Sequence, residues 1–278
     1  MGALPDGGAP TRDEGTGMAN QELLRLEHIS KRFGAVQALT DVEFTVDAGE
    51  VVALVGDNGA GKSTLIKVVS GIFGPDRGTV TFDGEVRALS SPSEATALGI
   101  ATVYQDLALC DNLDVVANLY LGRERRGVGP FLDETDMERE AATLLKRLSV
   151  AIPSVRIPIA SLSGGQRQSV AVAKATMGRP KLVILDEPTA ALGVPQTRQV
   201  LALIRRLRDE GLGVIVISHN LVDVFAVADR ITVLRLGRTV AELRAGETDA
   251  EQVVAAMTGA DQTEVGEAFS LSGGGESR

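Results

Sequence analysis

A glycine-rich segment, GDNGAGKS, occupies residues 56–63, directly after the apolar run VVALV. It matches the pattern G-x-x-x-x-G-K-S/T, in which glycines let the backbone curl so that successive amides point at phosphate oxygens. The helical stretch that follows would add its positive N-terminal end to the same site. The segment therefore predicts a phosphate loop for ATP or GTP. Its expected nucleotide-binding residues are Gly56, Asp57, Asn58, Gly59, Ala60, Gly61, Lys62, Ser63 and Thr64.

Four side chains have expected chemical roles at this loop. Lys62 would reach the β- and γ-phosphates, and the Ser63 hydroxyl would be a ligand of Mg²⁺. The run KLVILDE, residues 181–187, ends in two acids. A carboxylate at the carboxyl end of a central strand, beside a phosphate loop, is placed to hold Mg²⁺ through water, and this residue is Asp186. Glu187 comes next and could orient or deprotonate the attacking water.

Short apolar strands alternate with amphipathic helices along the chain, and these elements must position the site. The alternation predicts an α/β fold with a mostly parallel sheet covered by helices. The strands are almost continuously apolar, which is typical of central parallel strands buried on both faces. Ser163 and Gln166 have capping-box spacing at the start of the third helix, and Gly178 and Pro180 end it. The strands are expected at 51–55, 182–185 and 214–217, and the helices at 62–70, 138–148, 166–177 and 196–210.

Composition limits the class of protein. The chain has 278 residues, a hydrophobic share of 44%, a net charge of −9 and no Trp. Nucleic-acid binding needs a basic face and aromatic stacking platforms, so no nucleic-acid partner is expected. The single cysteine, Cys110, excludes an internal disulfide and is expected to be a small buried residue. No apolar run approaches the roughly 20 residues that cross a bilayer.

The segment LSGGQ, residues 162–166, narrows the class further. Two glycines at a helix N-terminus expose several amide donors and Ser163 adds a hydroxyl, so the segment is expected to bind an anion. It resembles the signature motif of the ATP-binding-cassette (ABC) ATPases. The other family elements lie in the expected order. Gln105 in VYQD resembles the Q-loop glutamine, His219 in VISHN the switch histidine, and Phe33 in KRFG the aromatic that stacks on adenine.

The resemblance covers roughly residues 23–257 and implies a fold. That fold is the P-loop NTPase cassette of the ABC type, a mostly parallel sheet flanked by helices, with an antiparallel β edge and a helical subdomain. It implies an ABC ATPase domain at residues 22–261, with the helical subdomain at about 106–164. Residues 1–21 and 262–278 are rich in Gly, Ser and acidic residues and are expected to be disordered tails.

The resemblance also implies residue roles. Glu187, His219 and Gln105 are the expected catalytic residues, with His219 hydrogen-bonding the γ-phosphate and the attacking water. Gln105 would contact Mg²⁺ or that water, so the expected metal-binding residues are Ser63, Gln105 and Asp186. In the family, the signature of one cassette closes over the γ-phosphate held by another, so ATP lies between two chains. The implied contacts are Phe33 at the adenine and, from the second chain, Ser163, Gly164, Gly165 and Gln166.

Two longer stretches, at 187–197 and 91–122, are similar to the ribose-, xylose- and fructose-type sugar importers. This similarity implies a peripheral subunit at the cytoplasmic face of the cell membrane, which hydrolyses ATP to energise import of a sugar. The implied partners are transmembrane permease subunits, a second cassette in a homodimer and, indirectly, an extracytoplasmic sugar-binding protein. The implied cofactors are ATP and Mg²⁺.

The sequence departs from the family pattern in two ways. The loop after the strand-end acids usually ends in Leu-Asp, whereas this chain has Leu192-Gly193, so the carboxylate that would bridge to the partner's phosphate loop is missing. Many such importers fuse two cassettes, whereas this chain has room for one. A nucleoside or lipid transporter subunit remains an alternative, because substrate choice lies in partner subunits. A soluble ABC protein acting on DNA or ribosomes is disfavoured by the acidic composition and the lack of a heptad run.

Overall fold

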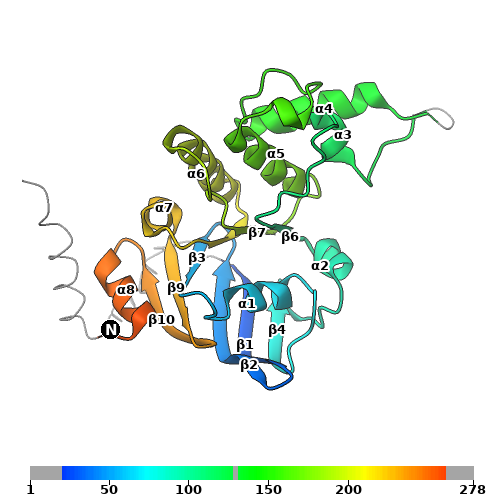
Figure 1. The fold of residues 1–278 in the computed structure, drawn as a ribbon. Coiled ribbons are helices and arrows are strands. Elements are labelled where there is room, and N and C mark those ends of the chain that lie inside the picture. The colour runs from blue at the N-terminus through cyan, green and yellow to red at the C-terminus, as the bar shows by residue number, and fades with distance from the viewer. Residues whose placement is uncertain (1–20, 128–130, 261–278) are drawn as a thin grey trace, which may run out of the picture.

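The computed structural model describes residues 21–127 and 131–260, and Figure 1 shows their fold. The tails expected at 1–21 and 262–278 lie outside the described residues, apart from Gln21. The described chain forms a four-stranded sheet and a six-stranded sheet. None of the helices in these residues has both the length and the apolar character needed to span a membrane.

The four-stranded sheet is antiparallel, with strand order β2-β1-β4-β5. Its first two strands form a hairpin with a tight turn at Gly34, which has a left-handed backbone (φ 57°). One face carries buried apolar side chains, including Leu24, Leu26 and Phe44. The strands are β1 (Glu22–Phe33), β2 (Val36–Asp47), β4 (Arg77–Phe82) and β5 (Glu85–Val86).

The six-stranded sheet has the order β10-β9-β3-β8-β7-β6 and is parallel except for β10, which pairs antiparallel with β9. Every residue of β3 and β8 is buried, as expected for strands covered on both faces. The three apolar runs noted in the sequence are therefore its central strands. The strands are β3 (Val51–Val55), β6 (Ile100–Val103), β7 (Leu182–Asp186), β8 (Gly213–Ile217), β9 (Arg230–Arg235) and β10 (Arg238–Arg244).

Helices cover both faces of the six-stranded sheet. Figure 1 shows α3, α4 and α5 gathered at one end of the molecule, away from the antiparallel sheet, which lies near α1. The helices are α1 (Lys62–Val69), α2 (Pro92–Leu98), α3 (Val115–Tyr120), α4 (Glu134–Arg147), α5 (Gly164–Thr176), α6 (Val194–Asp209), α7 (Leu221–Val227) and α8 (Ala250–Thr258), with a 3₁₀ turn at Ile159–Ser161.

The six-stranded sheet is the middle layer of the core. Alternate residues of β7 belong to different apolar clusters, because successive side chains of a strand point to opposite faces. Val183 and Leu185 pack with α5, α6 and the helical end of the molecule. Leu182 and Ile184 pack with α1 and the antiparallel sheet. The site at the end of this strand is thus held by packing on both sides.

Local signals explain where two of the helices begin. At α5 the predicted capping box is present, because the Ser163 hydroxyl accepts from the Gln166 amide and the Gln166 side chain accepts from the Ser163 amide. Helix α4 begins at Glu134, four residues before its expected start, with Asp133 as its N-cap. Its first turn is polar, so apolar periodicity alone did not reveal it.

The expectation for Cys110 was wrong. Its side chain is only half-buried, in the loop between β6 and α3. The buried Asn118 carboxamide accepts from the Cys110 amide at 2.7 Å and donates to the Cys110 carbonyl at 2.9 Å. This loop is therefore held by its backbone and Asn118, rather than by burial of the cysteine.

Candidate active site

Neighbouring strand ends bring the predicted catalytic residues together. The phosphate loop follows β3, His219 follows β8, Glu187 follows β7 and Gln105 follows β6, and these four strands are consecutive in the sheet. Their carboxyl ends meet at one edge, where a cleft of about 830 Å³ opens. Its size suits a nucleotide. The predicted residues that line it are Gly56, Asp57, Asn58, Gly59, Ala60, Gly61, Lys62, Ser63, Thr64, Gln105, Asp186, Glu187 and His219.

The phosphate loop depends on glycine at its two ends. Gly56 has φ 147°, and a Cβ there would lie 2.2 Å from the Leu234 carbonyl oxygen. Gly61 is the N-cap of α1, in a left-handed conformation (φ 108°) and without a side-chain cap. The first amides of α1 therefore face the cleft side of the helix without an internal partner, which is the arrangement that binds phosphate.

A turn from the C-terminal part of the chain braces the same loop. The Gly237 amide donates to the Ala60 carbonyl at 2.9 Å, and the Gly237 carbonyl accepts from the Thr40 amide at 2.7 Å. Gly237 lies between β9 and β10, whereas Thr40 lies in β2. The loop is thus held between the two sheets.

Lys62 lies folded over its own loop. Its ammonium donates to the carbonyls of Gly56 and Asp57, the latter at 3.0 Å. Burial lowers the pKa of Lys62, while the carboxylates of Glu187, Asp57 and Asp186 act in the opposite direction. A triphosphate in the cleft would offer this cation stronger acceptors than the two carbonyls.

Asp186 and Glu187 end β7 side by side. Burial raises the pKa of Asp186, the neighbouring Glu187 raises it further, and Lys62 acts against both. Glu187 has a left-handed backbone (φ 49°), and its amide donates to the Ile217 carbonyl at 2.9 Å. The Nδ1 atom of His219 lies 2.9 Å from the Glu187 Oε2 atom. The carboxylate is therefore already paired with the residue expected to act beside it.

A buried acid joins the two turns that carry Glu187 and His219. Asp223 of α7 accepts from the Thr189 hydroxyl at 2.7 Å and from the Asn220 side chain at 3.2 Å. Thr189 lies two positions after Glu187, and Asn220 directly follows His219. This contact fixes the separation of the two turns and was not foreseen from the sequence.

The signature residues lie elsewhere. Ser163, Gly164, Gly165 and Gln166 are absent from the cleft lining. The Gln166 side chain makes contacts within its own chain, since it completes the capping box and donates to the Ala151 carbonyl at 3.0 Å. Within one chain, the signature and the cleft are therefore separate.

Phe33 is also outside the cleft lining. Its side chain is 46% exposed and meets the Phe73 ring edge-on, with 5.1 Å between ring centroids. The Lys31 ammonium lies 5.7 Å from the Phe33 ring centre. Val36, three residues later, does line the cleft. Phe33 thus lies close to the cleft in sequence, with an exposed face.

Several lining residues were not foreseen. Val36, Gln37 and Ala38 follow Phe33, so the adenine expectation for Phe33 could have been extended to them. Met257 lies near the end of α8, about two hundred residues after the phosphate loop, and no motif marks it. Only the return of α8 against β9 and β10 brings it here.

Comparison with known proteins decides the family. Residues 39–190, more than half of the chain, match the family model described as ABC transporter. This chain belongs to the ABC transporter family. The family predicted from LSGGQ and its companion motifs is thereby confirmed.

Three curated relatives of this ABC protein are sugar import proteins by name. The xylose/arabinose import ATP-binding protein of Sulfolobus acidocaldarius is 46% identical and covers 85% of this chain, which spans 94% of that relative. The fructose import ATP-binding protein of Rhizobium meliloti is 44% identical, with coverages of 88% and 97%. A ribose import ATP-binding protein of Burkholderia ambifaria is 44% identical over 85% of this chain, but this chain spans only 47% of that longer relative.

Solved structures agree with the ABC fold. A nucleotide-free ATP-binding cassette from an ABC transporter aligns with a TM-score of 0.73 at 27% identity, covering 88% of this chain and 98% of that one. A cassette in its ADP conformation gives the same TM-score and identity over 89% and 99%. A dimeric cassette bound to ADP and phosphate gives 0.67 at 25% identity over 80% and 99%. The predicted fold class is confirmed.

Proposed function

We propose that this chain is the ATP-binding and ATP-hydrolysing subunit of a sugar importer. The observation that carries the chemistry is the cleft in which the phosphate loop, Asp186, Glu187 and His219 meet. The family is that of transport ATPases, and the relatives named for xylose, fructose and ribose import support the sugar. The identity of the sugar depends on partner subunits.

ATP would bind with its phosphates on the loop from Gly56 to Ser63. The loop amides and Lys62 supply positive charge, and Val36 offers an apolar contact in the same cleft. Phe33 would stack on the adenine from the adjacent hairpin. Mg²⁺ suits the donors present, since Ser63, Gln105 and Asp186 all offer oxygen atoms. When bound, the ion would neutralise charge on the β- and γ-phosphates.

Glu187 is proposed as the general base for hydrolysis. It would accept a proton from water as the water oxygen attacks the γ-phosphorus and the bond to the ADP oxygen breaks. His219, 2.9 Å from Glu187, would orient the carboxylate and hydrogen-bond the γ-phosphate. The bond between Thr189 and Asp223 would keep this pair in register during turnover.

A second copy of the chain would complete each site. Ser163 is exposed at the start of α5, while its own cleft is elsewhere, so the exposed amides there can serve a partner's γ-phosphate. The dimeric cassette among the solved relatives supports this arrangement. We propose a homodimer with two ATP molecules at its interface.

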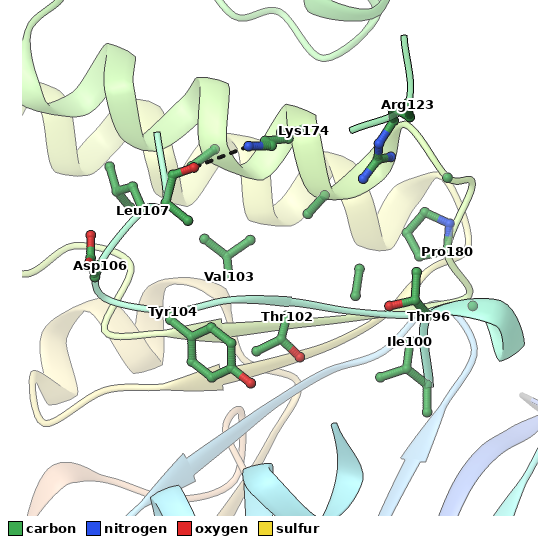
Figure 2. Close-up of a pocket in the computed structure, with 16 residues that line it drawn as sticks. Thr96, Ile100, Thr102, Val103, Tyr104, Asp106, Leu107, Arg123, Lys174 and Pro180 are labelled. Carbon is green, nitrogen blue, oxygen red and sulfur yellow. Dashed lines mark hydrogen bonds between the residues drawn. The ribbon is translucent and has the colours of Figure 1, made fainter. Parts of the chain in front are cut away.

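The permease is proposed to dock beside Gln105. A groove of about 220 Å³ lies between β6, the segment 104–108 and α5. Figure 2 shows Val103 pointing toward α5, which carries Lys174, with Arg123 beside it. These two cations suit a carboxylate on a cytoplasmic segment of the permease. Because Gln105 belongs to the same segment, its position would follow docking.

In this proposal the subunit lies at the cytoplasmic face of the cell membrane, held there by the permease. An extracytoplasmic sugar-binding protein would deliver the sugar to the opposite face. ATP binding would close the dimer and hydrolysis would allow it to open, and this cycle would move the permease.

The first test is sedimentation of the Glu187→Gln chain with and without ATP and Mg²⁺. The amide cannot accept the proton, so ATP should stay intact and hold a dimer, while the wild-type chain should hydrolyse ATP and remain mostly monomeric. A Glu187→Gln chain that still hydrolyses ATP would contradict the assigned base. Import assays with xylose, fructose, ribose and a nucleoside would then distinguish a sugar importer from a nucleoside transporter.

A further inference from the structure

The first turns of α5 and α6 approach closely at the signature. A Cβ on Gly165 would lie 2.6 Å from the Cβ of Gln196 and 3.2 Å from its Cα. A Cβ on Gly164 would lie 3.1 Å from the Cδ2 of Leu192. The Cα and Cβ of Gln196 belong to the first turn of α6 and cannot swing away as a side-chain end could. The second signature glycine is therefore required by its close contact with Gln196.

Gly193 has a different reason to lack a side chain. Its backbone angles are φ −74° and ψ 163°, which any residue adopts. A Cβ there would lie 2.8 Å from the Oε1 atom of Gln196. This oxygen is the flexible end of the Gln196 side chain, so a side chain at 193 would require the carboxamide to turn away from the space that it fills beside Gly193. This is the position where related cassettes carry a carboxylate and this sequence has none.

We propose that Gln196 is a positioning residue that joins the signature motif to the loop after Glu187. Its stem packs on Gly165, and its carboxamide fills the space beside Gly193. This inference rests on the proposed function, because the signature acts on ATP only across a dimer.

The contact gives the two ATP sites a direct connection. The loop from Glu187 leads into α6 within seven residues, so a displacement of that loop moves Gln196. Gln196 in turn packs against Gly165 at the start of α5. A displacement at Glu187 of one chain would thereby shift the signature of that chain, which covers the partner's ATP. Gly193 and Gln196 are a matched pair, in which packing replaces a bridging carboxylate.

Substitutions at position 196 test the contributions of the stem and of the carboxamide separately. Gln196→Ala removes the stem and the carboxamide, and should lower kcat about tenfold by loosening the catalytic geometry. ATP binding by the monomer should change little, because no residue of the chain's own cleft is altered, whereas the KM for ATP should rise together with the ATP concentration that dimerisation requires. Gln196→Met keeps the unbranched stem and should restore most of the rate. Gln199→Ala, at an exposed glutamine of the same helix, is the matched control.

A pair of substitutions tests the match with Gly193. Gly193→Asp supplies the carboxylate but places it against the Gln196 carboxamide, so alone it should lower kcat. Combined with Gln196→Ala it should give a higher rate than Gln196→Ala alone, because the space is then free. Thermal melting of every variant checks folding, and if the alanine variant fails to fold, Gln196→Met and Gly193→Asp carry the test.

The decisive comparison is ATP-dependent sedimentation of these variants in the Glu187→Gln chain. Gln196→Ala should raise the ATP concentration needed for dimerisation several-fold. A Gln196→Ala chain with unchanged kcat and unchanged dimerisation would overturn the role of Gln196 and leave the proposed function intact. Independent, multiplicative effects of Gly193→Asp and Gln196→Ala would also overturn it. A parent chain that neither hydrolyses ATP nor dimerises would overturn the proposed function, and this inference with it.

Discussion

Asp186 and Glu187 are adjacent in sequence, yet they have different surroundings. Glu187 has His219 as a partner 2.9 Å away. Asp186 is partly buried beside a like charge, and both effects raise its pKa. A carboxylate held in a costly state is expected where a cation is to be bound, because binding then relieves the repulsion. The charge of Asp186 therefore favours binding of a cation, which the chain itself does not supply.

Asp186→Asn should stabilise the nucleotide-free chain while abolishing hydrolysis. The amide has the same shape without the charge, and the gain should be at most about 2 °C in Tm, since solvent screens half of the side chain. A raised folded-state pKa penalises the charged form, so the gain is present above that pKa. It should vanish as the pH falls below the ordinary value of 3.8, where the carboxyl is protonated in both states.

Calorimetric melting of both chains over a pH series measures this effect. The Asp209→Asn chain, altered at a more exposed acid in α6, is the control. A Tm difference that grows as the pH is lowered would contradict the assigned direction of the Asp186 pKa.

Among the helices, α5 is proposed to serve two functions, contact with the partner's ATP and docking of the permease. Its N-terminus carries the signature, and its last turn carries Lys174 at the proposed docking groove. Its buried side chains, including Val170 and Val172, belong to the core cluster that also contains Val183 and Leu185 of β7. In the proposed assembly, this helix would connect permease docking at the groove to the dimer interface at the signature.

Ser163→Arg should leave ATP binding by the monomer intact and stop hydrolysis. Arginine removes the hydroxyl that caps α5, at a cost of about 1 kcal/mol, and places a bulky cation on the exposed signature. Binding of a fluorescent ATP analogue and release of phosphate measure the two effects separately. Ser163→Thr, which keeps a capping hydroxyl, should remain active. Full hydrolysis by Ser163→Arg would argue against the shared site.

Lys174→Glu should weaken capture of the permease about tenfold. It replaces one of the two cations of the groove by an anion, which would repel the carboxylate expected from the permease. Co-purification with the permease, at low and high salt, measures the effect. Lys146→Glu, at an exposed lysine of α4, is the matched control and should copurify as the wild type does. Equal capture of both variants would remove the groove from the docking surface.

At the scale of the whole molecule, the proposed dimer is the functional unit. Each ATP would use the phosphate loop of one chain and the signature of the other, so neither chain has a complete site. The six-stranded sheet fixes the first half, and α5 presents the second.

Two inactive variants should therefore restore each other. A Lys62→Ala chain retains its signature, and a Ser163→Arg chain retains its phosphate loop, so a mixed dimer contains one intact site. With random pairing, the mixture should reach up to about a quarter of the wild-type rate. Phosphate release is measured for each chain alone and for the mixture. A mixture as inactive as its components would contradict the two-chain site.

Much of this arrangement could be predicted from the sequence. The apolar strands, the phosphate loop and the capping box are local patterns, so Val51–Val55 and Ser163 were placed correctly. Contacts that depend on strand order were not accessible. His219 and Glu187 meet because β7 and β8 are neighbours, and Met257 reaches the cleft because α8 folds back. The hydrophobic periodicity of the sequence predicts neither of these positions.

The packing of Gln196 on Gly165 was equally hidden. The sequence marks Gly193 as a departure, but it does not say what fills the space. That answer needed the distance between two helix N-termini. Side-chain packing between elements far apart in sequence is the part that one sequence leaves undetermined.

The strand order also has a consequence for how the protein is made. Strand β3, which leads into the phosphate loop, pairs with β8 and β9, and Gly237 completes the bracing of Ala60. A ribosome adding residues in order synthesises the loop at position 56 and its last support about 180 residues later, which at 5–20 residues per second takes on the order of ten seconds or more. Until β8 has been made, at residues 213–217, β3 has no partner on either edge. Nucleotide binding is therefore gained only after residue 237 has been made, and a nascent chain that retains ATP has already assembled its central sheet.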